Sequence, residues 1–337
     1  MNRSGVICAG NFIVDRLRFV ESWPEQEMLS SIASEAFSNG GGPYNVLKDL
    51  SAMGATFPLE AAGCVGDDPD GLWIAEDCRT AGIDTAQLHV VGDAPTSYTE
   101  VICVTTTAKR TFFHRRGANA LLSQSHIDFG RIRASHFHLA YLMLLDALDE
   151  EGPTGRTGAS ELLEKAKNAG LTTSADLVST ENPRFQEKVA QSLPYIDYLF
   201  INELEAERAT GLKIRQAHEV SISAALDAAK QLLAGGVKRQ VILHFSAGAV
   251  VCDVSGETLT RGSLLLSADC IVGTNGAGDA FAAGYLFGLQ SGWSTSDCLN
   301  LAIATAAMCL RDASPSSGLL PVEQCLDLIR RFPSRDL

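Results

Sequence analysis

Short runs of apolar and β-branched residues alternate with longer stretches of helical periodicity along most of the chain. The short runs predict buried strands at 5–10, 59–66, 135–142, 171–177, 196–202, 239–245 and 249–253. The longer stretches predict helices at 43–55, 70–82, 160–170, 183–193, 223–236, 276–292, 295–312 and 321–332. This alternation predicts an α/β fold, in which a central, mostly parallel sheet carries helices on both faces.

Two segments, 12–38 and 96–117, break the alternation and are typical of antiparallel strands joined by turns. In the second segment, strands at 99–106 and 110–116 flank the turn-like residues 107–109. We expect both segments to form a small β lid, inserted into a single α/β domain that spans residues 1–337. Because isolated hairpins are marginal and bare strand edges associate, the lid strands should pair with each other or join two copies in a homodimer.

Composition narrows the classes of partner. The formal net charge of −13 argues against nucleic acid, because proteins that bind it usually present a basic face. The longest apolar run, 139–145, is too short to span a membrane, and the N-terminal residues lack the pattern of a signal peptide. The nine cysteines form no CxxC pair and so indicate reduced, mostly buried thiols, as expected of a cytoplasmic protein.

The segment "GTNGAGDAF", Gly273–Phe281, lies where an apolar run gives way to a helix. The first turn of a helix has N–H groups without intrahelical partners, and the small residues Gly276, Ala277 and Gly278 would let an anion approach them. Asp279, in the same turn, could accept a proton from an attacking hydroxyl group. The alternative is an ordinary glycine-rich turn followed by an acidic first-turn residue.

Three further clusters lie at predicted strand ends or helix starts. Gly41 and Gly42 precede a predicted helix whose first turn contains Asn45, which suits sugar hydroxyls or, alternatively, a simple connector. Asp15 follows the first strand, where it could grip two hydroxyls or merely be solvated. Asn202 and Glu205, three residues apart, could order a hydrated magnesium ion and nucleotide phosphates, or could only cap a helix.

Across nearly its whole length the sequence resembles the ribokinase-like carbohydrate kinases, also called the PfkB family. "GTNGAGDAF" matches most of the family signature D-T-x-G-A-G-D-x-F, and "GNFIVD" matches an N-terminal motif of the type G-N-x-x-x-D. "GGGPYN" supplies the glycines and the asparagine of a second N-terminal segment, and "NELE" matches the family's N-x-x-E. The lid-like segment is followed by R-G-A-N, as is common in the family.

The resemblance implies ATP-dependent phosphorylation of a hydroxyl group on a sugar or sugar derivative. Asp279 would be the general base, and the N–H groups of Gly276, Ala277 and Gly278 would stabilise the transition-state charge. The residues expected to bind the sugar are Asp15, Gly41, Gly42 and Asn45. Asn202 and Glu205 would position ATP with Mg²⁺, and Glu205 would act on the metal through water. The lid would close and exclude water.

The sequence departs from the family pattern near the nucleotide. Gly273 replaces an aspartate that usually helps to hold a monovalent cation, which leaves potassium activation open. The loop 311–318, near the adenine and cation sites of relatives, is also not a close match. His244 is expected either to donate a hydrogen bond to a phosphate or to pack as a structural histidine. Ser246, in place of a glycine of the family, could narrow the path by which the nucleotide enters. Gly248 is expected beside the nucleotide.

The identity of the acceptor substrate is what the sequence determines least. Arg115 and Arg116 end a lid strand; Arg116 could bind a phosphate or carboxylate group of the substrate, or both could be solvated charges. A nucleoside kinase on the same fold is a second hypothesis, for which Phe12, Phe19 or Phe113 would have to supply an aromatic pocket. A catalytically weak sugar-binding regulatory protein is a third, which the intact signature around Asp279 disfavours.

Overall fold

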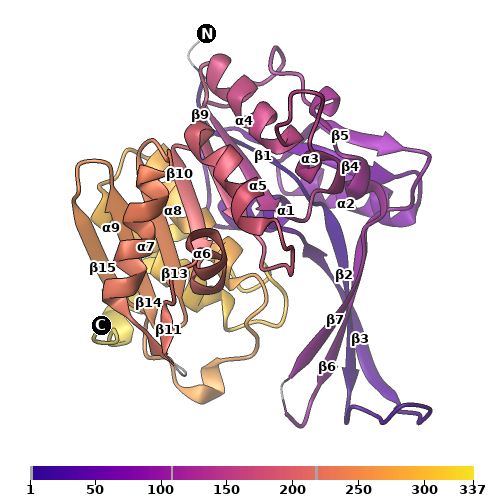
Figure 1. Cartoon of the computed structure of the whole chain (residues 1–337). Helices are drawn as coiled ribbons and strands as arrows, with labels where there is room; N and C mark the ends of the chain where they lie inside the picture. Colours follow the sequence, from indigo (N-terminus) through magenta and orange to yellow (C-terminus); the bar gives the residue numbers. More distant parts are fainter. Residues whose placement is uncertain (1–2, 108, 217–218) are drawn as a thin grey trace.

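The computed structural model of the chain describes residues 3–107, 109–216 and 219–337, and its centre is a nine-stranded sheet (Figure 1). The strand order is β15-β14-β13-β10-β9-β8-β1-β4-β5. The strands are β1 Val6–Ala9, β4 Leu59–Gly66, β5 Asp84–Val91, β8 His136–Leu142, β9 Thr172–Leu177, β10 Tyr198–Asn202, β13 Gln240–Phe245, β14 Gly248–Asp253 and β15 Thr258–Gly262. From β13 to β5 every pair is parallel, and β14 and β15 add an antiparallel edge.

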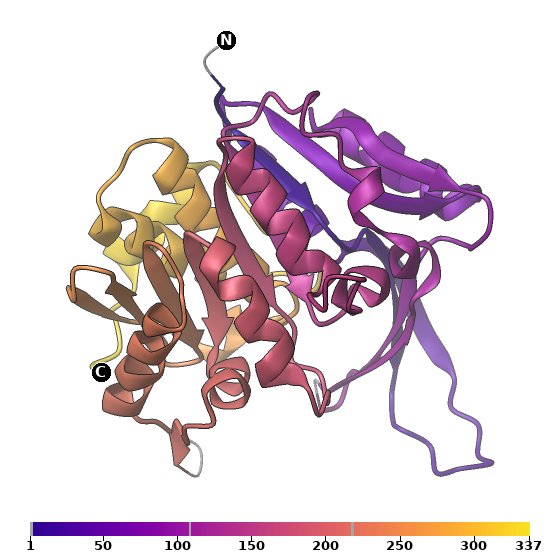
Figure 2. The same cartoon turned by 45° about the horizontal axis from the view of Figure 1, so that its top comes forward.

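Helices cover both faces of the sheet, which confirms the predicted α/β architecture. One face packs on α1 Gly42–Ala52, α2 Pro69–Thr80, α8 Ala277–Gln290, α9 Thr295–Cys309 and α10 Val322–Arg331. The other packs on α3 Asp146–Asp149, α4 Gly158–Asn168, α5 Phe185–Ser192, α6 Glu203–Thr210 and α7 Ile222–Ala234, the layer in front of the sheet in Figure 2.

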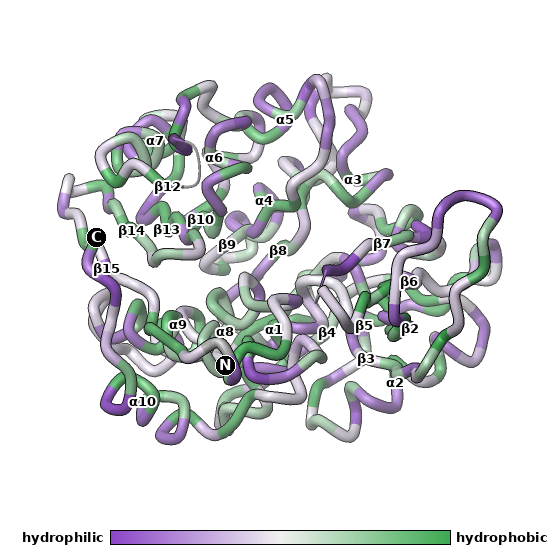
Figure 3. The backbone as a smooth tube through the Cα atoms, turned by 90° about the horizontal axis from the view of Figure 1, so that it is seen from below, coloured by the Kyte–Doolittle hydropathy of each residue, from purple (hydrophilic) through white to green (hydrophobic). Residues whose placement is uncertain are grey.

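Each buried strand serves both layers because successive side chains point to opposite faces. In β1, Ile7 and Ala9 join the core under the second layer, whereas Val6 and Cys8 join the core under the first. Helices α8 and α9 are apolar along most of their length, as the tube in Figure 3 shows, because they are packed against each other as well as against the sheet.

The lid is a separate four-stranded sheet in the order β3-β2-β6-β7, which extends from the body as an arm (Figure 1). Its strands are β2 Ile13–Val20, β3 Ile32–Gly40, β6 Tyr98–Val104 and β7 Arg110–Arg115. The pairs β2–β3 and β6–β7 are antiparallel, as the sequence predicted, but the two hairpins join through the parallel pair β2–β6. The turn predicted at 107–109 includes residue 108, which lies outside the described residues.

Two strands of the main sheet, β5 and β15, had not been predicted. Both lie at sheet edges, where one side of the strand faces solvent and the apolar pattern is diluted; Val90 in β5, for example, is 62% exposed. A ribbon of β11 Arg215–Gln216 and β12 Glu219–Val220 completes the strands of the described residues. Within these residues, no helix has the length and apolarity needed to cross a membrane, and all nine cysteines are free thiols.

Candidate active site

Helix α8 begins with open backbone amides. Its N-cap residue, Gly276, has the left-handed φ of 79° that favours glycine, and no side chain caps the first turn. A Cβ at this position would lie 2.5 Å from the Cβ of Pro315, so the close approach of the loop also requires glycine. The N–H groups of Ala277, Gly278 and Asp279 therefore begin the helix without a capping side chain, as an anion site needs.

Asp279 is held in one orientation beside those amides. Its side chain is buried, and its Oδ2 accepts hydrogen bonds from Asn45 Nδ2 at 2.7 Å and from the Tyr141 hydroxyl at 3.0 Å. Burial raises the pKa of Asp279 to about 6, and the two hydrogen bonds oppose that rise. The carboxylate is thus ionised at neutral pH, and Oδ1 makes no hydrogen bond to a described side chain.

The glycine-rich segment before α1 serves mainly to bring backbones together. Gly41 has a φ of 88°, and a Cβ there would lie 2.0 Å from the carbonyl oxygen of Asn11. A Cβ at Gly42 would lie 2.8 Å from the ring of Tyr141. These glycines let α1 start close to β8, which places Asn45 against Asp279.

Asn45 has a role that the sequence had not suggested. Its Nδ2 donates to Asp279, and its Oδ1 accepts from Asn39 Nδ2 at 2.7 Å. Asn39 Nδ2 also donates to Ser316 Oγ at 2.9 Å. Both ends of the Asn45 amide are therefore engaged by protein groups, and the side chain orients the carboxylate; a contact between Asn45 and a sugar hydroxyl stays a prediction.

The lid contributes Asp15 to the same region. The side chain is buried, and its Oδ2 accepts from Asn275 Nδ2, in the signature loop, at 3.1 Å. Burial raises the pKa of Asp15 to about 7, and hydrogen bonds from Asn275 and Thr99 oppose the rise. The charge of Asp279 also contributes to that rise, so the carboxyl groups from β2 and α8 are close enough to interact.

Asn202 and Glu205 form a capping box at the start of α6. The Asn202 N–H donates to Glu205 Oε2 at 2.9 Å, and the Glu205 N–H donates to Asn202 Oδ1 at 2.9 Å. Asp176, at the end of β9, joins them in lining a cavity of about 250 Å³ that Asp279 also lines. Burial raises the pKa of both Asp176 and Glu205.

This acidic cavity fits a hydrated cation better than a directly ligated one. Within the described part of the chain, no three His, Cys, Asp or Glu side chains are arranged to ligate a metal ion together. The carboxylates of Asp176 and Glu205 nevertheless face one cavity, and Mg²⁺ commonly keeps several waters while it uses one or two carboxylates. The residues therefore fit the water-mediated contact expected of Glu205.

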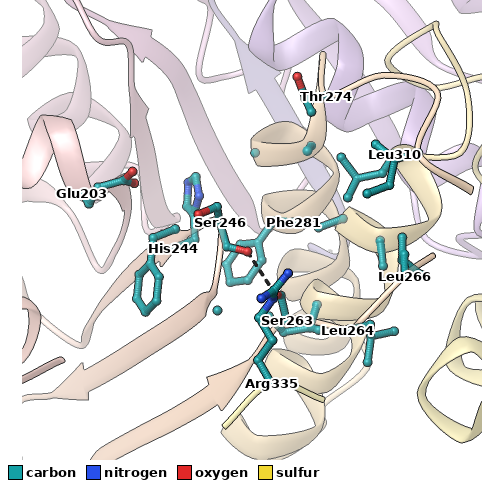
Figure 4. A pocket seen from close by; sticks show the side chains of 18 residues that line it. Glu203, His244, Ser246, Ser263, Leu264, Leu266, Thr274, Phe281, Leu310 and Arg335 are labelled. Atoms are coloured by element: carbon teal, nitrogen blue, oxygen red, sulfur yellow. Dashed lines mark hydrogen bonds between the residues drawn. The ribbon is translucent and has the colours of Figure 1, made fainter. Parts of the chain in front are cut away.

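A second cavity, of about 410 Å³, lies on the other side of the α8 start (Figure 4). Its lining is mostly aliphatic and aromatic and includes Leu264, Leu266, Phe281, Ile303, Ala306, Ala307 and Leu310. His244, Ser246 and Gly248, the expected nucleotide contacts, line it as well. Such a cavity, apolar with a few polar groups, is typical of a site for a planar cofactor or nucleotide base.

His244 lies where the two cavities meet. Its ring packs 5.1 Å from the ring of Phe281, and a Cβ at Gly278 would lie 3.3 Å from its Cε1. Burial lowers the pKa of His244 to about 4, so the imidazole is neutral at physiological pH. The histidine is both packed and adjacent to the α8 amides, so a neutral N–H can donate to an anion there.

The two cavities share His244, Thr274, Ala277 and Gly278. A ligand in the apolar cavity can therefore extend past the first turn of α8 into the acidic cavity. At that junction it meets the backbone amides and, beyond them, the carboxylate of Asp279. This arrangement suits the transfer of a terminal phosphoryl group from one cavity to an acceptor in the other.

Arg116 is not brought to this site. Its guanidinium pairs with Asp146 at 3.0 Å, both side chains are 46% exposed, and it lines neither cavity. A different lid arginine, Arg110, lies against Gly273 at the start of the signature loop, although it lines neither cavity either.

Three residues that line the cavities were missed from the sequence: Tyr141, Asp176 and Arg335. Asp176 ends a strand that the sequence did predict, so the rule that ligands bind at the carboxyl ends of parallel strands could have found it. Tyr141 has an unusual positive φ of 63°, a strained conformation for an aromatic residue that no sequence pattern reveals. Arg335 reaches the apolar cavity from the C-terminal segment, pointing toward Ser246 and Ser263 in Figure 4.

The comparisons with known proteins all point to one family of kinases. The model of the pfkB family carbohydrate kinases matches residues 3–322. The chain is 25% identical to a 5-dehydro-2-deoxygluconokinase of Shouchella clausii, with 86% of each protein covered. It is 26% identical to an ATP-dependent ribose-1-phosphate kinase of Halopiger xanaduensis, with 90% of each covered.

Among solved structures, the ribokinase of Arabidopsis thaliana complexed with ribose and ATP superposes with a TM-score of 0.77 at 21% identity. The match covers 97% of this chain and 99% of that one. The likeness in structure establishes a ribokinase fold, and the family model covers all the motifs of the site. The chain therefore belongs to the pfkB family of carbohydrate kinases.

Proposed function

We propose that this protein transfers the terminal phosphoryl group of ATP to a hydroxyl group of a sugar or sugar derivative. The observation that carries the proposal is the position of Asp279: a buried, ionised carboxylate beside uncapped helix amides, where an apolar cavity meets an acidic one. Membership of a carbohydrate kinase family supports the same conclusion.

In the proposed reaction, the adenosine part of ATP occupies the apolar cavity and its phosphates extend toward α8. Asp279 Oδ1 accepts the proton of the acceptor hydroxyl as its oxygen attacks the terminal phosphorus, while Asn45 and Tyr141 hold Oδ2. The amides of Gly276, Ala277 and Gly278 stabilise the negative charge on the transferring group. Neutral His244 donates a further hydrogen bond at the junction.

The remaining roles follow from the same geometry. Asn202, Glu205 and Asp176 would hold water molecules around Mg²⁺. The ion held there would supply positive charge that offsets the negative charge of the phosphates. Asp15 and Asn275, joined by a hydrogen bond between lid and body, would grip acceptor hydroxyls, with the backbones of Gly41 and Gly42 on the facing side. The lid, with its strands at 13–40 and 98–115, would exclude water and so favour transfer over hydrolysis.

The experiment is an assay of ADP release with ATP, Mg²⁺ and a panel of acceptors: pentoses, hexoses, sugar acids, sugar phosphates and nucleosides. Turnover with a sugar or its derivative, lost in Asp279→Asn, supports the proposal. Turnover restricted to nucleosides would replace it with the nucleoside kinase hypothesis. Binding of sugars without turnover of any acceptor would favour a regulatory sugar-binding protein.

We further propose that the lid joins two copies of the chain. Its outer strands, β3 and β7, have no partner beyond the four-stranded sheet of the described residues. Large apolar side chains are exposed on the lid: Trp23, Met28, Leu29, Ile32, Phe37, Phe112 and Phe113. Exposed edges beside apolar side chains favour association. Light scattering after gel filtration should give a dimer, and Phe37→Lys should weaken it; a wild-type monomer at micromolar concentration would contradict the proposal.

A further inference from the structure

Gly273 opens the signature loop, and Arg110 takes up the space that a side chain at this position would fill. Its φ is not among the positive values of the described glycines, so the backbone does not require glycine. A Cβ at this position would instead lie 2.2 Å from Arg110 Nη2 and 3.1 Å from Arg110 Cζ. It would also lie 3.0 Å from the carbonyl oxygen of Asp312. The guanidinium of Arg110 therefore occupies the space between the signature loop and the loop at 311–318.

Arg110 reaches this space from the inner face of the lid. It begins β7 opposite Cys103 of β6, on the face where Leu17 and Val101 pack against Ala313 of the loop at 311–318. The lid thus rests on that loop, and Arg110 extends past the contact to Gly273. A side chain that belongs to the lid is in this way placed beside the anion site of the body.

The guanidinium of Arg110 is not fully satisfied by neighbouring protein groups. Its Nη1 is buried and has no hydrogen-bond partner among the described residues. Its charge still acts on the site: burial raises the pKa values of Asp15 and Cys309, and the charge of Arg110 opposes both rises. Cys309 Sγ lies under the signature loop, 3.3 Å from the carbonyl oxygen of Asn275.

These residues do not fit a monovalent cation at this place. The signature aspartate that would help to hold one is replaced by Gly273, so the start of the loop lacks that carboxylate. A permanently charged guanidinium fills the gap between the two loops and would repel a second cation at such short range.

We propose that Arg110 supplies, from the lid, the positive charge that a bound monovalent cation would otherwise supply beside the anion site, so that phosphoryl transfer does not depend on potassium. The proposal rests on the kinase activity proposed above. Because the charge arrives only with the lid seated on the loop at 311–318, the anion site is complete only in the closed molecule. With the lid open, the anion site therefore gives little stabilisation to the transition state for attack by water, and this limits hydrolysis of ATP. In this proposal Arg110 does not touch the reacting atoms, and its charge acts on them through space.

The first test measures kcat and KM in sodium, potassium, caesium and tetramethylammonium chlorides at one ionic strength. We expect kcat values that agree within about twofold, since exposed charges are screened equally by these salts. Stimulation by potassium of tenfold or more over tetramethylammonium would overturn the proposal. So would a caesium ion between residues 273 and 312 in the anomalous map of a crystal soaked in caesium chloride, a result that needs no activity. Failure of the proposed kinase function is recognised separately, as absence of turnover in all four salts.

The second test removes the charge. Arg110→Gln should lower kcat by about tenfold, less than the hundredfold that follows loss of a donor in direct contact with a developing oxyanion. Arg110→Lys keeps a charge and should retain more activity than Arg110→Gln. Arg115→Gln is the matched control, because Arg115 is on the same strand but lies over the Tyr98 ring on the other face of the lid. An unchanged kcat in a folded Arg110→Gln protein would overturn the proposal.

The third test exchanges one arrangement for the other. The double variant Arg110→Gln with Gly273→Asp vacates the gap and restores the carboxylate. We expect its kcat to rise with potassium but not with tetramethylammonium, whereas the single variant Arg110→Gln should respond less. Equal kcat values for the double variant in the two salts would count against the exchange and hence against the proposal. Circular dichroism and melting temperature show that each variant is folded.

Discussion

The two cavities that meet at the start of α8 are built from opposite chemistry. The larger, of about 410 Å³, is lined mainly by aliphatic and aromatic side chains, and the smaller, of about 250 Å³, contains three carboxyl groups. An apolar surface binds a ligand because apolar area is removed from water, and this effect depends little on exact atomic positions. A carboxylate that accepts a proton must be correctly placed and must be ionised. Changes in the first cavity should therefore alter the KM for ATP, and changes in the second should alter kcat.

The largest expected effect lies in the acidic cavity. Asp279→Asn preserves shape and removes the proton acceptor, so kcat should fall by about 10²- to 10⁴-fold, the usual contribution of a general base. The KM for ATP should change little, because the apolar cavity is untouched. Steady-state kinetics with the best acceptor measures both; a loss seen only in KM would erase the distinction between the cavities.

The acidic cavity should also confer a pH dependence. The pKa of Asp279 is raised to about 6 by burial, so acid protonates the carboxylate and abolishes its ability to accept a proton. Burial and, to a smaller extent, the charge of Asp279 also raise the pKa values of Asp15, Asp49 and Asp176. Glu205, with a pKa raised to about 7 by burial, lines the same cavity as Asp279. We expect kcat/KM at pH 5 to be about tenfold or more below its value at pH 7.5. A flat profile between these values, with the fold intact, would contradict the assignment.

In the apolar cavity, the sharpest variant is Arg335→Ala. The C-terminal segment pairs with the strand end at Ser263, where the Arg335 N–H donates to the Ser263 carbonyl at 2.9 Å, and so holds the guanidinium over the cavity. Loss of a cation that can cover a base should raise the KM for ATP by about threefold to tenfold and leave kcat unchanged. Arg330→Ala, an exposed arginine paired with Asp327 on α10, serves as the control.

The smallest expected effect concerns Tyr141. Its hydroxyl stabilises the ionised form of Asp279, so Tyr141→Phe should raise the pKa of Asp279 and move the acid limb of the profile to higher pH. The shift should be less than about one unit, since one hydrogen bond contributes about 1 kcal/mol. A shift in the opposite direction would show that the tyrosine does not act on the ionised carboxylate.

The sequence predicted the regular parts of the molecule better than its irregular ones. The parallel sheet and its helices were readable because buried strands are uniformly apolar and packed helices repeat every three to four residues. The edge strands β5 and β15 escaped because half of each faces solvent. The parallel contact between β2 and β6 was equally unreadable, because it pairs strands about 80 residues apart.

The same limit applies to the site. Asp279, Asp15, Asn202 and Glu205 could be nominated because they sit at strand ends or helix starts, which the pattern of the chain locates; their roles stay predictions. The positions of Arg110 against Gly273 and of Arg116 against Asp146 could not be predicted, because the direction of a lid side chain depends on how the lid sits on the body. The contact of Asn45 with Asp279 joins residues 234 positions apart and only folding reveals it.

The most direct test of the central claim is a crystal structure with a non-hydrolysable ATP analogue and the acceptor that turns over best. We predict that Asp279 Oδ1 lies within about 3.2 Å of one acceptor hydroxyl, with the terminal phosphate on the amides of residues 276–278 and the base in the cavity lined by Leu264 and Phe281. A complex with Asp279 still packed away from both ligands, or with the nucleotide outside that cavity, would contradict the account.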